Sequence, residues 1–356
     1  MTSLNPLTTL EFSSGADAAT DLAGLFKALG DALRLDILRV MRGDSFSVSE
    51  LCDVFELRQS ALSHHLKVLV NADWLTRRRE GTAIYYRRQL PTGPEATLRE
   101  QIINAIDDQP LSAEHREKLD AIQRSREQNS LAFFRDNVAR FREQQELIAS
   151  WDDYSAASLH ILDTAQLAAD AKLLEIGPGD GRLLPQLATR CSRVIALDNS
   201  PAMLESARAN VGERVTDSGG KLVGARGNGS GPTGTHISYV LGDTQKALNE
   251  GIAADGIVMN MVLHHTPNPK QVLAEAAQLL RPEGVLVISE LCAHDQGWAR
   301  DHCGDLWLGF EADELAGWAE DAGLTHRARL FIAQRNGFQI QVQLFQRASA
   351  NKGSEA

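Results

Sequence analysis

Two carboxylates and three glycines between Glu175 and Asp198 are the residues of this chain best suited to chemistry. Gly177, Gly179 and Gly181 alternate with other residues directly after a short apolar run. Glycines allow a turn that brings backbone amides against a ligand. Asp198 ends the next apolar run, where an acid can accept hydrogen bonds from both hydroxyls of a ribose. The pattern therefore predicts a nucleoside site.

Two strands and a helix must position these groups. Residues 172–176 and 194–197 have the length and character of buried parallel strands, and residues 183–187 predict an amphipathic helix between them. Such a unit binds nucleosides at the carboxyl edge of a parallel sheet. The sequence thus predicts an α/β fold for this part of the chain.

The spacing of the glycines disfavours a nicotinamide dinucleotide. The dinucleotide fingerprint needs glycine at its sixth position, where this chain has Arg182. Glu175 also puts a negative charge beside the site, which would repel a pyrophosphate. A cationic ligand suits this charge better.

The run Glu175–Gly181 and the run Leu197–Ser200 resemble motifs I and II of class I S-adenosylmethionine (SAM) methyltransferases. The resemblance covers roughly residues 150–347 and implies a Rossmann-like fold that binds SAM or its product S-adenosylhomocysteine. It assigns Asp243 to the amino group of the adenine. The residues expected at the cofactor are Glu175, Gly177, Gly179, Gly181, Asp198, Asn199, Met203, Asp243, Thr244 and Asn260.

Histidines near the same sheet edge are the candidates for catalysis. Methyl transfer needs alignment, and a base when the acceptor must lose a proton. His264 is the base that we favour over His265 and His294, and the alternative is that each is a polar residue lining the sheet edge. Cys292 and Cys303 are thin support for an arsenite-methylating site.

The front of the chain predicts four helices and a hairpin. Asp31 can cap the second helix, and Ser47 with Glu50 has the spacing of a capping box before the third. The fourth helix, 59–69, turns three leucines inward. The strands 74–79 and 83–88 follow, and many arginines lie on them.

This arrangement offers hydrogen-bonding side chains to the major groove of DNA and arginines to the flanking phosphates. The helix residues expected at DNA are Gln59, Ser60, Ser63, His64 and Lys67. The hairpin residues expected there are Arg77, Arg79 and Arg87, with Arg78 and Arg88 beside them.

The segment from Phe26–Asp31 through Ser63–Leu69 to the hairpin resembles the arsenic-repressor (ArsR) family of bacterial regulators. The resemblance implies a winged helix-turn-helix that binds double-stranded DNA as a homodimer. A winged helix used only for protein contacts is the alternative. Metalloid-sensing members carry Cys-x-Cys in the third helix, where this chain has only Cys52, so we expect no metal site.

These resemblances divide the chain into five parts. We predict a flexible lead-in at 1–20, the winged helix at 21–92, a helical connector or dimerisation segment at 93–150, the methyltransferase-like domain at 151–347 and a tail at 348–356. The connector either packs on a neighbouring domain or forms a dimeric coiled segment. Its apolar rhythm comprises Leu131, Phe134, Val138, Phe141 and Ile148. Residues 212–236, crowded with Gly, Ser and Thr, predict a flexible insertion.

Length, composition and net charge restrict the class of protein that this chain can be. A chain of 356 residues exceeds one average domain, and its 43% hydrophobic content is enough for proper cores. A net charge of −11 argues against indiscriminate coating of nucleic acid. The four cysteines are scattered, and no signal peptide or membrane anchor is evident, so we expect a reduced, cytoplasmic protein.

The two halves together predict a transcriptional regulator that senses SAM or S-adenosylhomocysteine, with methyl-cycle genes as natural targets. The alternative is an active small-molecule methyltransferase whose DNA-binding half regulates its own synthesis. Methylation of a DNA base is discounted, because the run Asn260–Leu263 lacks the Asn-Pro-Pro-aromatic motif of amino-directed DNA methyltransferases.

Overall fold

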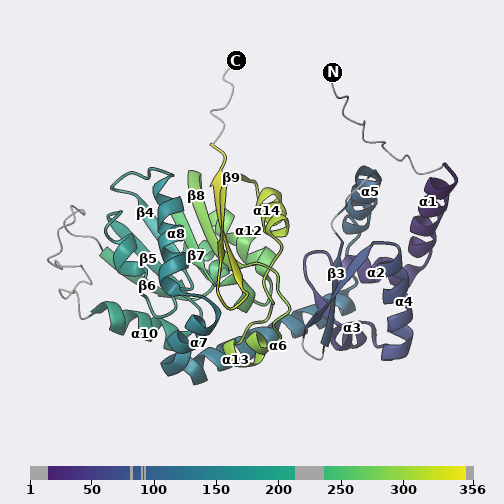
Figure 1. The fold of residues 1–356 in the computed structure, drawn as a ribbon, viewed down its shortest axis with the longest axis horizontal. Helices are drawn as coiled ribbons and strands as arrows, with labels where there is room; N and C mark the ends of the chain where they lie inside the picture. Colours follow the sequence, from purple (N-terminus) through teal and green to yellow (C-terminus); the bar gives the residue numbers. More distant parts are fainter. Residues whose placement is uncertain (1–14, 81–82, 90, 92–93, 213–235, 350–356) are drawn as a thin grey trace, which may run out of the picture. The chain divides into compact units, whose positions relative to one another are not determined.

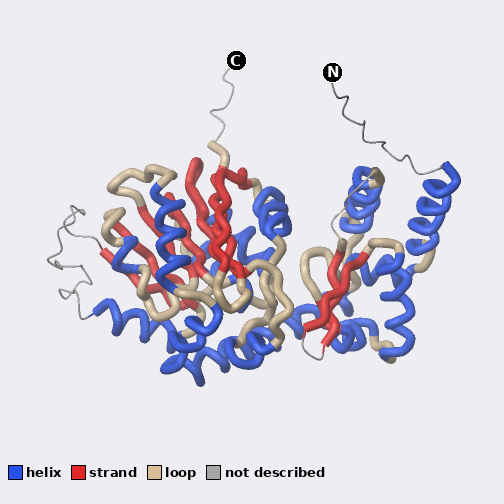
Figure 2. The backbone as a smooth tube through the Cα atoms, viewed as in Figure 1, coloured by secondary structure: helices blue, strands red, loops and turns tan. Residues whose placement is uncertain are grey.

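The computed structural model describes residues 15–80, 83–89, 91, 94–212 and 236–349 (Figure 1). Its contacts divide the chain into two units, Met1–Leu119 and Asp120–Ala356, each with its own sheet (Figure 2). The division falls inside α6 (Ala113–Asn137), so the second half of the predicted connector groups with the domain that follows it. Among the described helices, none has the length and apolar character needed to cross a membrane.

The first unit is a winged helix, as predicted. Its antiparallel sheet has the order β1-β3-β2, and β2 pairs with β3 as the expected hairpin. The elements are α1 (Gly15–Leu29), α2 (Ala32–Val40), β1 (Phe46–Ser47), α3 (Val48–Phe55), α4 (Gln59–Asn71), β2 (Leu75–Glu80), β3 (Ala83–Arg88) and α5 (Ala96–Asp107).

Caps set the starts of two of these helices. The side chain of Asp31 accepts a hydrogen bond from the backbone N–H of Arg34 at the start of α2. Ser47 and Glu50 form a reciprocal capping box at the start of α3, which confirms the prediction. By contrast, α1 begins at Gly15, inside the predicted lead-in, and residues 1–14 lie outside the described part of the chain.

The helix α4 is held by its inner face. Leu62, Leu66 and Leu69 repeat at helical spacing and are all fully buried. Because one helix face is anchored in this way, its opposite side chains keep a fixed orientation toward solvent.

The second unit contains a seven-stranded sheet of order β6-β5-β4-β7-β8-β10-β9. The first five strands in this order are parallel, and β10 runs antiparallel to both β8 and β9. This is the Rossmann-like methyltransferase sheet that the sequence predicted. The strands are β4 (Lys172–Ile176), β5 (Arg193–Asp198), β6 (His236–Leu241), β7 (Ala254–Asn260), β8 (Leu280–Leu291), β9 (Leu324–Ala333) and β10 (Gln339–Arg347).

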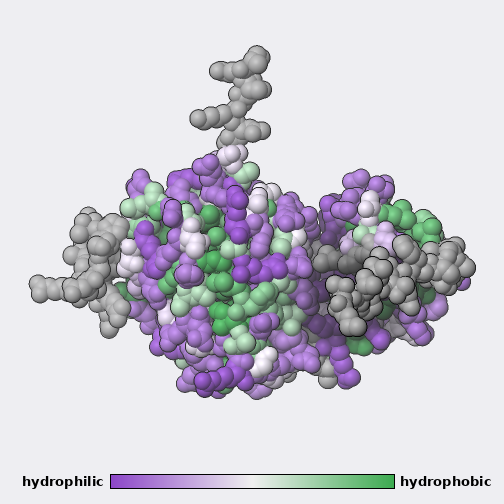
Figure 3. All heavy atoms as spheres, turned by 45° about the horizontal axis from the view of Figure 1, so that its top comes forward, coloured by the Kyte–Doolittle hydropathy of each residue, from purple (hydrophilic) through white to green (hydrophobic). Residues whose placement is uncertain are grey.

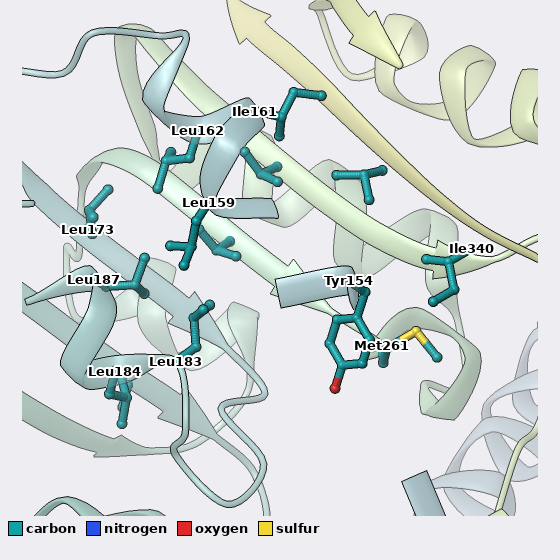
Figure 4. Packing of buried hydrophobic residues seen from close by; sticks show 14 of the residues in the cluster. Tyr154, Leu159, Ile161, Leu162, Leu173, Leu183, Leu184, Leu187, Met261 and Ile340 are labelled. Carbon is teal, nitrogen blue, oxygen red and sulfur yellow. The ribbon is translucent and has the colours of Figure 1, made fainter. Parts of the chain in front are cut away.

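Apolar side chains alternate between the two faces of this sheet. Leu173 belongs to the cluster shared with α8, α9 and α10, and Leu174 belongs to the cluster shared with α11, α12 and α14. Figure 4 shows the first cluster around Leu159 and Leu187. The helices are η1 (Val138–Arg140), α7 (Phe141–Ile148), α8 (Trp151–Asp163), α9 (Leu184–Leu187), α10 (Pro201–Gly212), α11 (Thr244–Asn249), η2 (Leu263–His265), α12 (Pro269–Leu279), α13 (Trp298–Cys303) and α14 (Ala312–Asp321).

The helix after the glycine turn is shorter than its sequence pattern indicates. The structure forms only a single turn, α9, with Pro185 in its first turn, where a missing N–H is tolerated. The Gly-rich insertion predicted at 212–236 lies almost entirely outside the described residues.

Hydrophilic side chains cover much of the face in Figure 3, and hydrophobic ones gather in smaller patches. Large apolar side chains that reach solvent include Leu22 and Phe26 on α1 and Phe331 on the edge strand β9.

One predicted DNA-contacting residue is engaged inside the first unit instead. The guanidinium of Arg88 donates to both carboxylate oxygens of Asp107, at 2.9 and 2.5 Å, and to the carbonyl of Leu38 at 2.6 Å. These bonds tie β3 to α5 and α2. Arg88 is therefore a structural residue, in contrast to the exposed Arg77 on the neighbouring strand.

We predict that Arg88→Ala lowers the unfolding free energy of the first unit by about 1–3 kcal/mol, because Asp107 loses its nearer charged partner in a part-buried site and keeps the more exposed Arg42 at 3.5 Å. Arg77→Ala is the matched control and should stay within about 0.5 kcal/mol of the parent. Urea unfolding of the full chain, followed by circular dichroism, measures both. Equal midpoints for the two variants would contradict the structural role.

Candidate functional site

The glycine turn after β4 depends on left-handed backbone angles and on space. Gly177, Gly179 and Gly181 have φ of +65°, +57° and +79°, in the region that other residues rarely adopt. A Cβ on Gly177 would lie 2.7 Å from a methyl carbon of Val262, and one on Gly181 would lie 2.9 Å from the Cα of Ala207. Only glycine fits at these two positions, because Val262 and Ala207 occupy the space that a side chain would need.

The two carboxylates at this turn are buried and hard to ionise. Burial raises the pKa of Glu175 to about 8, and the neighbouring charges of Asp180 and Asp198 add to the effect. Burial also raises the pKa of Asp198 to about 7, although a hydrogen bond from the backbone N–H of Ser200 opposes it. A cationic ligand would lower the pKa of both groups by stabilising their charged forms.

A cavity opens at the turn. Seven residues predicted at the cofactor line it: Glu175, Gly177, Gly179, Asp198, Asn199, Met203 and Asn260. A second cavity shares Gly177, Asp198 and Asn199 with the first and adds Asp243 and Thr244. Of the predicted cofactor residues, Gly181 alone lines neither.

Asp243 and Thr244 line the second cavity, and each forms a different hydrogen bond within the fold. Asp243 caps α11 by accepting a hydrogen bond from the backbone N–H of Lys246 at 2.7 Å. The hydroxyl of Thr244 is buried and donates to the carboxylate of Glu275. Thr244 thus has a partner within the fold, and Asp243 lies at the cavity edge with a capping role of its own.

Sequence reasoning missed one wall of the first cavity. Phe134 and Phe141, which the apolar rhythm of the connector contained, line it together with Glu127, Ser130 and Gln145. The ring of Phe141 lies against Gly179, where a Cβ would be 3.0 Å away. Packing on a neighbouring domain, one of the two interpretations of the connector, therefore describes this part of it.

Ion pairs fasten this wall to the glycine turn. The guanidinium of Arg142 donates to Asp180 at 2.9 and 3.0 Å, and Arg182 pairs with Glu146 at 3.2 Å. Arg182 also lies over the ring of Trp151, 4.7 Å from its centroid. Arg182, which argued against a dinucleotide, thus serves the packing of α7 and α8.

The two adjacent histidines have different surroundings. His264 is fully buried, and its Nδ1 lies 2.7 Å from a carboxylate oxygen of Glu290. Burial alone would lower the pKa of His264, but the charges of Glu290 and Asp305 raise it to about 9. His265 lines the cavity, packs edge-on against Phe134 at 4.9 Å, and its pKa is lowered by burial and by His264.

His265, and not the favoured His264, is thus the histidine at the cavity. His294, the third candidate, packs against Phe338 with ring centroids 4.7 Å apart and is not among the lining residues.

The predicted DNA-contacting residues share the outer face of α4 and the hairpin. Gln59, Ser60, His64 and Lys67 are exposed, and Ser63 is half-buried. Arg77 and Arg79 are exposed on β2, and Arg87 is half-buried on β3. The structure therefore leaves hydrogen-bonding and basic side chains accessible where the sequence placed them.

A winged helix with a basic hairpin, and a Rossmann-like sheet with a glycine turn, together define a DNA-binding regulator combined with a methyltransferase domain. Residues 31–75 match the arsR family of bacterial regulatory proteins, and residues 174–288 match a methyltransferase domain family. The chain belongs to the arsR family and carries a methyltransferase domain.

Known proteins resemble each half separately. The arsenical resistance operon repressor of Bacillus subtilis is 44% identical over 17% of this chain, and the match spans 59% of that repressor. The transcriptional repressor SdpR of the same organism is 32% identical over 17% of this chain and 69% of its own length. The ubiquinone biosynthesis O-methyltransferase of Xanthomonas axonopodis pv. citri is 24% identical over 49% of this chain and 74% of its own length.

The pKa of Glu175 leads to a pH dependence of cofactor binding. Below about pH 8 the carboxyl is protonated in the free protein, so binding a cationic ligand beside it requires loss of a proton. We predict that the affinity for SAM falls as the pH is lowered from 8.5 to 6, by at most about tenfold per unit for one proton. Calorimetry in buffers of matched ionic strength measures this.

Glu175→Gln is the control for this prediction. It should bind SAM more weakly at pH 8.5 and with a flatter dependence on pH, because one of the two titrating carboxyls is gone and Asp198, with a pKa of about 7, remains. An affinity for SAM that rises toward pH 6 in the parent protein would contradict the role of Glu175.

Proposed function

We propose that this chain is a cytoplasmic transcriptional regulator that binds operator DNA as a homodimer and senses SAM or S-adenosylhomocysteine through its methyltransferase domain. Genes of methionine and methyl-group metabolism are the targets that such a signal would serve. The observation that carries the proposal concerns the helix α6. Residues near its start contact α3 of the DNA-binding unit, and residues farther along it line the two cavities.

Near its start, α6 is attached to the end of α3. The ring of His115 packs edge-on against Phe55, with centroids 5.0 Å apart, and the ammonium of Lys118 lies 2.8 Å from the carboxylate of Glu56. The pair involving Glu56 is open to solvent, and such ion pairs add little to stability. Weak contacts of this kind can break and re-form with a small change in free energy.

Farther along, the same helix lines the cavities. Glu127, Ser130 and Phe134 face the first cavity, and Asp120, Gln123 and Arg124 line the second. Lys118 and Phe134 are sixteen residues apart, about 24 Å along a helix. A ligand that shifts or stiffens α6 would therefore act on a helix that is also attached to the DNA-binding unit.

In this proposal α4 reads the operator and the hairpin holds it. Gln59, Ser60, Ser63, His64 and Lys67 would contact bases and nearby phosphates, and Arg77, Arg79 and Arg87 would contact phosphates. Leu22 and Phe26 on α1, which are 37% and 50% exposed, support a dimer contact through that helix. Sedimentation of Phe26→Asp against the parent tests the dimer, and an unchanged mass would contradict it.

We predict that operator affinity changes about 5–150-fold on saturation with SAM or S-adenosylhomocysteine, the range of a coupling of about 1–3 kcal/mol. The operator is selected first from random duplexes, and anisotropy titrations then measure affinity with and without each ligand. Asp198→Ala should keep the ligand-free DNA affinity and lose the response, because its ribose contact is gone.

Lys67→Ala is the matched control, since it should weaken DNA binding with and without ligand and leave the ratio unchanged. It should also flatten the salt dependence of binding. Equal operator affinity in the presence and absence of both ligands, with ligand binding verified by calorimetry, would contradict sensing.

The second candidate function is methyl transfer to a small molecule, and the position of His265 favours it. A histidine at the cavity beside the aromatic wall of Phe134 and Phe141 is where an acceptor would need a base. Incubation of the protein and radiolabelled SAM with a metabolite extract tests this, with Asp198→Ala as the inactive control. Label in a small-molecule product supports the enzyme, and none despite tight SAM binding contradicts it.

A further inference from the structure

A cluster of His264, His265 and Asp305 adjoins the cavity. The proposed regulator uses none of these residues, and His265 has a role only in the second candidate function. The two histidines belong to η2, and Asp305 follows α13. Each of the three residues offers one ligand atom, and these atoms lie within 4.8 Å of one another. All three side chains are buried, with exposures of 0%, 8% and 0%.

The cluster contains polar atoms that lack hydrogen-bond partners. Both carboxylate oxygens of Asp305 and the Nε2 atoms of both histidines are buried without one among the described residues. The nearest charged neighbours of Asp305 are long contacts, 3.9 Å to His264 Nε2 and 3.9 Å to His265 Nδ1. Buried polar atoms without partners are rare, and several around one point call for an occupant between them.

Glu290 prepares His264 for such an occupant. Its carboxylate lies 2.7 Å from Nδ1 of His264 and also accepts a hydrogen bond from the backbone N–H of Val262 at 2.9 Å. With Nδ1 engaged, the lone pair of a neutral His264 is on Nε2, toward Asp305. A carboxylate behind a histidine in this manner is the usual support of a metal-ligating imidazole.

We propose that His264, His265 and Asp305 bind one divalent transition-metal ion, with Glu290 as the positioning residue. Two imidazoles and one carboxylate suit zinc, iron or cobalt, and do not suit magnesium. Tetrahedral bonds of about 2.1 Å place ligand atoms about 3.4 Å apart. The ligand atoms of the cluster lie within 4.8 Å of one another, so the site has to contract when the ion binds.

Two further features favour a metal ion. A divalent cation would neutralise the carboxylates of Glu290 and Asp305 together, whereas a proton on His264 supplies one charge only. Three protein ligands also leave a coordination position for water or a small molecule. Of the three residues, His265 is the one that lines the cavity, so the cluster adjoins the cavity at that side chain.

The test uses the untagged full chain, because a histidine tag would bind the same ions. The apoprotein is titrated with ZnCl₂ by calorimetry and with CoCl₂ by visible absorption. We expect one equivalent of each to bind, with intense cobalt bands typical of a tetrahedral site, and MgCl₂ to give no heat. Zinc should also raise the melting temperature.

Three variants assign the site. Asp305→Asn and His265→Asn should lose the stoichiometric binding of zinc, and Glu290→Gln should weaken it about 10–100-fold. His302→Ala removes an exposed histidine of α13 and should bind zinc like the parent. The circular-dichroism spectrum and the melting temperature of the metal-free protein verify that each variant is folded.

Two results would overturn the metal site. The first is absence of a one-to-one zinc complex in the parent protein, which would leave a proton as the occupant. The second is a zinc affinity of folded Asp305→Asn equal to that of the parent. Neither result tests whether the protein senses SAM or S-adenosylhomocysteine, because that proposal is tested separately by operator binding.

Discussion

The carboxylate of Glu290 fixes the loop on which the cavity depends. Glu290 is completely buried at the end of β8, and it accepts hydrogen bonds from the backbone N–H groups of Val262 and Leu263. A buried carboxylate is expensive unless such donors surround it, so the loop has little freedom to adopt another path. The path it takes presses Val262 against Gly177 and brings His265 to the cavity. The glycine turn and the histidine pair are thus held by a single acid on a neighbouring strand.

Local signals in the sequence predicted most of the elements, the glycine turn and the acid at the end of β5. Glycines at left-handed positions, an acid at the end of β5 and the capping box at Ser47 are determined by their neighbours in the chain, so their spacing is informative. Arg88 shows where this reasoning ends. It stands next to Arg87 in the same basic hairpin, and its partners on two helices, Asp107 on α5 and the carbonyl of Leu38 on α2, give it a structural role. The aromatic wall and Asp305 were missed for the same reason, since they reach the site through long-range packing.

The character of α6 follows from its composition. It is a long and largely polar helix, and Arg126 is its buried residue, with its guanidinium over the ring of Trp307 at 5.0 Å. A helix without a broad apolar stripe is positioned by few contacts. The charged and aromatic groups on its cavity side are therefore a large part of what holds it, and changes in the cavity would alter its stability more than they would alter a helix seated in a core.

The aromatic wall formed by Phe134 and Phe141 also determines where a truncated fragment of the chain can begin. The methyltransferase motifs begin at β4, and a fragment started at residue 151 would keep every one of them. It would lack Phe134, Phe141 and Arg142, and so expose Gly179 and leave Asp180 with Arg182 as its remaining guanidinium partner. A fragment that preserves every described residue lining the two cavities has to begin before Asp120, within α6.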